Sequence, residues 1–170
     1  NQYFGDRRDY FKINLLLDLV SGAELQQIVS LVMLTPNDET AEGRLTAFPV
    51  GKGRAALHEF LNGAVAANRR HVSELREFMA SASIRYVAHH DDRFFAHERR
   101  LAYFGALTHV VLDSALVFYD PDIGIEFANT ASMRRSGLHK YVLESDLALV
   151  SELAPPPTLF VVYQHFQADK

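Results

Sequence analysis

The sequence predicts an α/β fold in which a mostly parallel, Rossmann-like sheet carries helices on both faces. Stretches with helical apolar spacing alternate along the chain with short continuous apolar runs, which are typical of strands buried on both faces. This alternation is the pattern of a parallel sheet built from strand–helix–strand units. The expected strands are residues 28–38, 84–90, 114–120 and 158–166.

The remaining segments are predicted as helices or loops. Apolar residues at helical spacing predict helices over residues 8–20, 54–80, 93–108 and 140–153, with a break in the second near Gly63. The three prolines that follow the last helix end it. Turn-forming residues are frequent over 39–53, which predicts a loop there.

Each expected strand runs directly into polar residues. The four ends read TPND, HHDD, DPDIGIE and QHF. Ligands bind open parallel sheets beyond the carboxyl ends of the strands, so we expect a site at these ends.

Length and composition restrict the class of protein. The 170 residues suffice for one domain with its own core, and we expect a single α/β domain over 1–170, with more structure following it. A net charge of −4 argues against a general electrostatic grip on nucleic acid, although it leaves a local basic patch open. The absence of cysteine excludes disulfides, thiolate catalysis and cysteine-ligated zinc.

The chain shows no segment suited to a membrane. No apolar run approaches the roughly 20 residues that a membrane-spanning helix needs, and no signal-peptide pattern opens the sequence. We therefore expect a cytoplasmic protein that acts on a small-molecule or nucleotide ligand. The sequence does not predict an oligomeric state.

The first motif, GDRRDYFK, places Asp6, Asp9 and Lys12 at three-residue spacing before a leucine-rich helix. On a helical wheel Asp9 falls in the apolar stripe, and the helix is expected to be buried on most sides. One interpretation is helix chemistry alone, with Asp6 as the N-cap and Asp9 paired with Lys12. The other is that this helix head lines a cleft and that Lys12 reaches an anionic ligand.

The second motif, DPDIGIE, gathers Asp120, Asp122 and Glu126 after the clearest strand. Such a loop can use its carboxylates to cap backbone amides, to hold Mg²⁺ or Mn²⁺, or to bind the amine of a substrate. The spacing does not choose among these roles. His165, at the end of the last strand, is a further candidate catalytic residue, and HHDD is interpreted as a solvated loop.

Four motifs together resemble two families. GDRRDYFK, DPDIGIE, HKYV and VVYQHF are similar to motifs of a bacterial and phage family without an assigned activity. More distantly, the chain resembles the S-adenosylmethionine-dependent adenine methyltransferases of large-subunit ribosomal RNA. That family opens with G-N-x-x-D-x-x-K, whose spacing is matched by Gly5, Asp6, Asp9 and Lys12, and later carries D-P-P-Y, whose first two residues match Asp120 and Pro121.

The second resemblance implies a methyltransferase-like fold with S-adenosylmethionine as cofactor. It implies that Lys12 helps to hold the cofactor carboxylate, and that Asp120 accepts a hydrogen bond from a target amine. By analogy with dinucleotide sites, Asn37 and Asp38 would contact the ribose. The cofactor-binding candidates are therefore Asp6, Asp9, Lys12, Asn37 and Asp38.

Two alternative functions stay open. One is a divalent-metal nuclease or phosphodiesterase. In it Asp120, Asp122 and Glu126 hold the metal with a contribution from Asp6 or Asp9, and Lys140 or Lys12 stabilises charge. The other is a non-catalytic relative that binds a ligand without turning it over.

Overall fold

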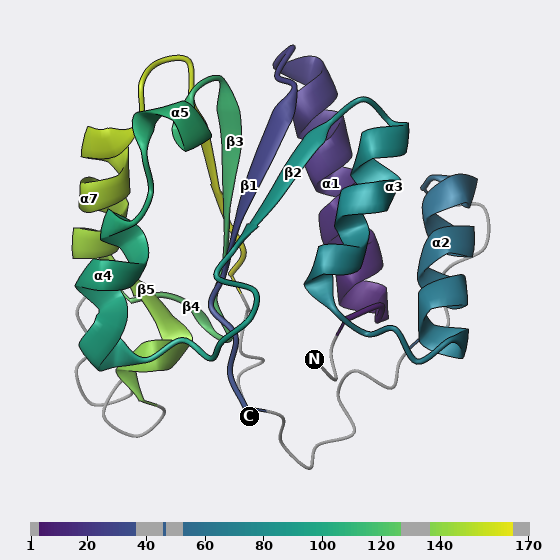
Figure 1. Cartoon of the computed structure of the whole chain (residues 1–170), viewed down its shortest axis with the longest axis horizontal. Coiled ribbons are helices and arrows are strands. Elements are labelled where there is room, and N and C mark those ends of the chain that lie inside the picture. The colour runs from purple at the N-terminus through teal and green to yellow at the C-terminus, as the bar shows by residue number, and fades with distance from the viewer. Residues whose placement is uncertain (1–3, 37–45, 47–52, 127–136, 165–170) are drawn as a thin grey trace. The chain divides into compact units, whose positions relative to one another are not determined.

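The structure, a computed structural model that describes residues 4–36, 46, 53–126 and 137–164, contains a four-stranded sheet in the order β2-β1-β3-β6. The strands, all parallel, are β1 (Gln27–Val32), β2 (Arg85–His89), β3 (Ala115–Asp120) and β6 (Leu159–Val162) (Figure 1). A second, parallel pair joins β4 (Gly124–Glu126) to β5 (Tyr141–Leu143). The predicted α/β class with a mostly parallel sheet is confirmed.

The chain divides into two compact units. The first comprises residues 1–28 and 37–87, and the second comprises residues 29–36 and 88–170. Strands β1 and β2 pass from the first unit into the second, so the carboxyl ends of all four sheet strands belong to the second unit. The single domain expected from the sequence stays a prediction.

The first unit contains α1 (Arg7–Gly22), α2 (Ala55–Ala66) and α3 (Leu75–Ser81), with a 3-10 turn, Val72–Glu74, before α3. Helix α1 buries a stripe at helical spacing that includes Ile13, Leu16 and Val20. The expectation that this helix is buried on most sides is wrong, because the exposed fraction is 61% for Phe11 and 39% for Leu15. The leucine-rich sequence of this helix did not indicate that Phe11 and Leu15 are exposed on one of its faces.

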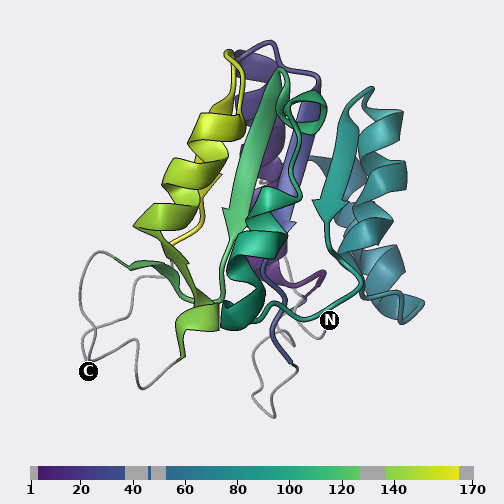
Figure 2. The ribbon, with the colours of Figure 1, turned by 60° about the vertical axis from the view of Figure 1, so that its left-hand side comes forward.

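The second unit is built around β3, whose first five residues, ALVFY, are all buried. It contains the helices α4 (Arg100–Gly105), α5 (His109–Leu112) and α7 (Glu144–Leu153), and the 3-10 turns His97–Arg99 and Leu138–Lys140. Helices α4 and α7 pack side by side in both views (Figures 1 and 2). Strand β6 pairs with β3 in register, with Leu116 opposite Leu159 and Tyr119 opposite Val162.

Several predicted boundaries are wrong, for physical reasons. The break in the expected helix 54–80 comes after Ala66 rather than near Gly63, because Asn68 adopts a left-handed conformation, φ +56°. Of the expected helix 93–108, only Arg100–Gly105 is α-helical, after the 3-10 turn His97–Arg99. The expected helix 140–153 begins at Glu144, because Tyr141–Leu143 pairs with β4 instead. Most of the loop predicted over 39–53 lies outside the described residues.

Candidate functional site

At the N-terminal end of α1, the polar side chains of the GDRRDYFK motif contact one another and the nearby backbone. Asp6 is the N-cap, and its Oδ1 accepts the backbone N–H groups of Arg8 and Asp9 at 2.8 and 2.9 Å. The carboxylate of Asp9 accepts the N–H of Gly5 at 3.0 Å and contacts the Lys12 ammonium at 2.8 Å. The predicted N-cap and the predicted Asp9–Lys12 pair are both confirmed.

These groups are well shielded from solvent. Burial, followed by the charge of Asp9, raises the pKa of the Asp6 carboxyl above its usual value. The Lys12 side chain is only 13% exposed. Its contact with Asp9 offsets the cost of holding a cation in this position. A role for Lys12 in binding an anionic ligand stays a prediction.

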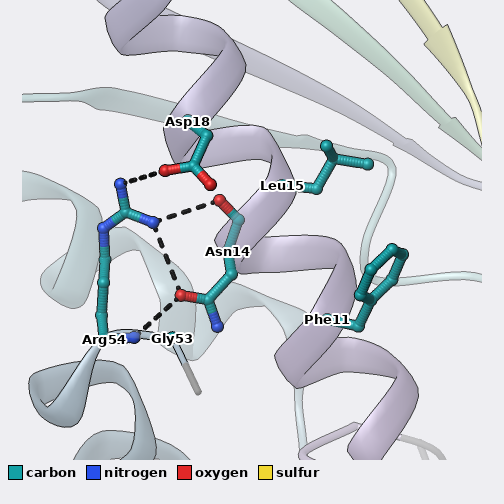
Figure 3. Close-up of a pocket in the computed structure, with 6 residues that line it drawn as sticks. All are labelled: Phe11, Asn14, Leu15, Asp18, Gly53 and Arg54. Carbon is teal, nitrogen blue, oxygen red and sulfur yellow. Dashed lines mark hydrogen bonds and ion pairs between the residues drawn. The ribbon is translucent and has the colours of Figure 1, made fainter. Parts of the chain in front are cut away.

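An open hollow lies on another side of α1, within the first unit. It has a volume of about 540 Å³ and is lined by Phe11, Asn14, Leu15, Asp18, Gly53 and Arg54 (Figure 3). The Arg54 guanidinium donates to the Asp18 carboxylate at 2.7 Å and to the backbone oxygen of Asn14 at 3.2 Å. None of the residues that the sequence singled out lines this hollow.

The DPDIGIE motif begins at the carboxyl end of β3, in the second unit. Asp120 is its first residue and is half-buried, and Pro121 behind it is buried. The Asp122 carboxylate lies 2.8 Å from the Lys140 ammonium, and the Ile123 N–H donates to the backbone oxygen of Lys140 at 3.0 Å. Lys140 therefore fixes one side of this turn through both its side chain and its backbone.

Gln164, just beyond β6, fixes the other side of the motif. Its Oε1 accepts the N–H of Ile125 at 2.7 Å. Gly124 adopts φ +147°, and a Cβ atom at that position would overlap the Gln164 side chain. The Gln164 side chain is flexible and could move aside, so glycine is required here by the positive φ, which residues with a Cβ atom rarely adopt. The expected strand 158–166 thus has a polar end that contacts the carboxylate motif.

The carboxylates of this motif do not gather into a metal centre. Among residues 4–36, 46, 53–126 and 137–164, no group of three His, Asp or Glu side chains is arranged to hold a metal ion. Asp122, one of the proposed ligands, is engaged by Lys140 instead. The described residues therefore give the Mg²⁺ or Mn²⁺ hypothesis no support.

Sequence reasoning missed a ring cluster at the end of β2. The Nε2–H of His89 donates to the backbone oxygen of Tyr103 at 2.7 Å, and burial lowers the pKa of His89 below its usual value. The ring of His90, a residue with φ +51°, lies 4.2 Å from that of His89 and 5.3 Å from that of Tyr103, between centroids. Both histidines are half-buried, so HHDD is not the fully solvated loop that was expected.

A buried ion pair was also missed. The Arg100 guanidinium contacts the Asp146 carboxylate, donates to the backbone oxygens of Leu138 and Tyr141 at 2.7 and 3.0 Å, and lies over the ring of Phe95. Burial raises the pKa of Asp146 and lowers that of Arg100. No local sequence pattern predicts this ion pair, because its two residues are 46 positions apart in the chain.

Three residues that the sequence predicts for the site lie outside the described residues. They are the expected ribose contacts Asn37 and Asp38 and the catalytic candidate His165. In the part of the chain that the structure describes, no helix has the length and apolarity to cross a membrane.

The two predicted clusters thus fall in different units, with the GDRRDYFK helix head in the first and the DPDIGIE motif in the second. The carboxyl edge of the sheet adds His89 and His90 to the predicted set. Comparisons with protein-family models, with curated proteins and with solved structures found no match to this chain.

Proposed function

We propose that the chain binds an adenosine-containing ligand, S-adenosylmethionine in the first instance, at the carboxyl edge of its sheet. The observation that carries this proposal is the strand order. From β1 the chain moves outward to β2, and it then returns to the other side of β1 for β3. Open parallel sheets bind nucleotides at such a reversal, beyond the carboxyl ends of the two strands that flank it.

The groups at this reversal suit such a ligand. Asp120 ends β3 there and supplies a carboxylate, which accepts hydrogen bonds from an amine or from a sugar hydroxyl. Phe95 donates its N–H to the backbone oxygen of Leu34 at 2.8 Å, which fixes the segment after β1. Next to the reversal, at the end of β2, the half-buried rings of His89 and His90 are proposed to stack on the adenine.

The proposed chemistry is methyl transfer to an amine, with Asp120 as the acceptor of the amine's hydrogen bond. This role follows from the resemblance of Asp120 and Pro121 to the start of the D-P-P-Y motif. S-adenosylmethionine would supply the methyl group.

Calorimetric titration with S-adenosylhomocysteine, in the presence of a chelator, tests the proposal. We expect micromolar binding by the wild-type chain. His90→Asn should weaken it about tenfold, because stacking of a base on an aromatic ring is worth roughly 1–3 kcal/mol and asparagine tolerates the φ of +51° at this position. His109→Asn is the matched control, since His109 is an exposed histidine on α5, and it should bind as the wild type does.

The proposal would be overturned if the titration gives no heat of binding and circular dichroism shows that the chain is folded. Binding that His90→Asn leaves unchanged would keep an adenosine site but remove the stacking role of His90. Binding only without the chelator would instead point to a metal-dependent site.

A further inference from the structure

Tyr119, the penultimate residue of β3, carries a buried hydroxyl group without a hydrogen-bond partner. The residue is 0% exposed. Within residues 4–36, 46, 53–126 and 137–164, its hydroxyl is the one buried side-chain N or O atom that makes no hydrogen bond. Proteins pair the large majority of such atoms with the chain or with ordered water, because a buried unpaired hydroxyl loses its hydration without compensation. The Tyr119 hydroxyl therefore calls for an acceptor that the described residues do not provide directly.

The charged group that acts on this hydroxyl is the Asp146 carboxylate. The ring of Tyr119 lies beside α4, with its centroid 6.2 Å from that of Phe104, and α4 packs against α7, whose first turn holds Asp146. Burial, followed by the negative charge of Asp146, raises the pKa of Tyr119 above its usual value. No hydrogen bond joins the two side chains, so they lie near each other without direct contact.

Asp146 keeps one carboxylate oxygen available for a further contact. The Arg100 guanidinium and the N–H of Leu143 both donate to Oδ2, and no hydrogen bond from the described residues reaches Oδ1. A carboxylate has about four acceptor positions, so Oδ1 can accept another donor. Because the side chain is only 3% exposed, little bulk water reaches it.

A second hydroxyl, that of Tyr103 in α4, is near enough to Tyr119 to interact with it. Burial, followed by the neighbouring Tyr119, raises the pKa of Tyr103. The Tyr103 hydroxyl donates to the backbone oxygen of His89 at 3.3 Å, so its own oxygen still has lone pairs that can accept. The surroundings of the Tyr119 hydroxyl thus contain two acceptors, Oδ1 of Asp146 and the hydroxyl oxygen of Tyr103.

We propose that one internal water molecule bridges the Tyr119 hydroxyl to Oδ1 of Asp146 and to the hydroxyl oxygen of Tyr103. The water accepts the O–H of Tyr119 and donates one hydrogen to each of the other two oxygens. Internal waters make about three hydrogen bonds, and they join polar groups that lie too far apart for a direct bond. The bridge extends the network of Arg100 and Asp146 to β3 and, through Tyr103, to the end of β2.

Urea denaturation of Tyr119→Phe tests the bridge through the sign of its effect, because phenylalanine keeps the ring and removes only the hydroxyl. Loss of a hydroxyl that is held by water breaks a hydrogen bond and lowers the urea midpoint, whereas loss of an unpaired buried hydroxyl raises it. We expect the midpoint to fall. Tyr103→Phe is the reference variant, since it removes a buried hydroxyl whose acceptor is known, and its midpoint should fall in the same direction. A Tyr119→Phe midpoint that rises or equals that of the wild type would overturn the proposal.

A second measurement identifies water as the partner. Nuclear magnetic resonance spectra of the isotope-labelled wild-type chain, recorded with magnetisation selected from water, report which protons lie beside a bound water. We expect cross-peaks from water to the ring protons of Tyr119 and to the β-protons of Asp146. A fall in the Tyr119→Phe midpoint without these cross-peaks would also overturn the proposal, because the hydroxyl would then have its acceptor in the chain itself.

Discussion

At the scale of single residues, the polar groups that the sequence singled out are held by neighbours close to them in the chain. Asp6 and Asp9 serve the first turn of α1, and the Lys12 ammonium contacts Asp9. Such contacts depend on spacing along a helix, which is why sequence alone predicted them. They also give each residue a structural role that can be measured without a ligand.

Asp6→Ala should destabilise the chain by about 1 kcal/mol, because two backbone N–H groups lose their acceptor. Urea denaturation followed by circular dichroism measures the loss. Asp6→Asn retains a capping oxygen and should stay within about 0.5 kcal/mol of the wild type. An equal loss in both variants would show that the negative charge of Asp6, rather than its cap, stabilises the helix.

His89 should make stability depend on pH. Its folded-state pKa lies below the ordinary value of 6.5, so the unfolded chain binds a proton more readily than the folded chain does. The contribution of His89 to stability is therefore complete above pH 6.5 and is lost as the pH falls from 6.5 toward the folded-state pKa.

The comparison of urea midpoints between pH 7.5 and 5.5 measures this effect. In His89→Gln, whose amide can still donate to the Tyr103 carbonyl, the midpoint should fall less over that range than in the wild type. His109→Gln alters an exposed histidine on α5 and should retain the wild-type slope. Equal slopes in all three chains would contradict the account.

At the scale of secondary-structure elements, the Arg100–Asp146 pair connects two helices and a strand of the second unit. Arg100 begins α4, Asp146 lies in the first turn of α7, and Asp146 also accepts the N–H of Leu143 at 2.8 Å. The guanidinium bonds to Tyr141 in β5 as well. One buried pair thus positions a strand and two helices around the DPDIGIE motif, since β5 pairs with β4.

Asp146→Ala should cost about 3–5 kcal/mol in the free energy of unfolding, because it leaves the buried Arg100 without its carboxylate. The double variant Arg100→Met with Asp146→Ala removes both charges and should cost less than the single variants Arg100→Met and Asp146→Ala combined. Denaturant titration of the wild type, the two single variants and the double variant completes the cycle. Arg93→Ala, which breaks an exposed pair with Asp92, should show no measurable change. Additive losses across the cycle would mean that the two charges do not stabilise each other.

At the scale of the whole molecule, the fold class was predictable and the strand pairing only partly so. Apolar runs identified all four strands of the sheet. Strands β1 and β3 are buried on both faces and have no polar alternation, whereas β2 alternates between buried and more exposed residues. The pair β4–β5 was not found, since strands of three residues carry too little pattern and Tyr141–Leu143 reads as the start of a helix.

The candidate site was likewise predictable only in part. The N-cap and the Asp9–Lys12 pair follow from helical spacing, and Asp120 follows from its place after a strand. The contact of Gln164 with Ile125 and the buried Arg100–Asp146 pair join residues that are 39 and 46 positions apart, so only the folded chain reveals them.

The most direct test of the proposed function is the location of the ligand. Backbone amide shifts of the isotope-labelled chain, measured while S-adenosylhomocysteine is added, report which residues it contacts. We predict that the shifts cluster at the carboxyl edge of the sheet, over residues 33–36, 89–90 and 120–125. Shifts confined to the hollow beside Phe11 and Arg54, or no shifts in a folded chain, would contradict the account.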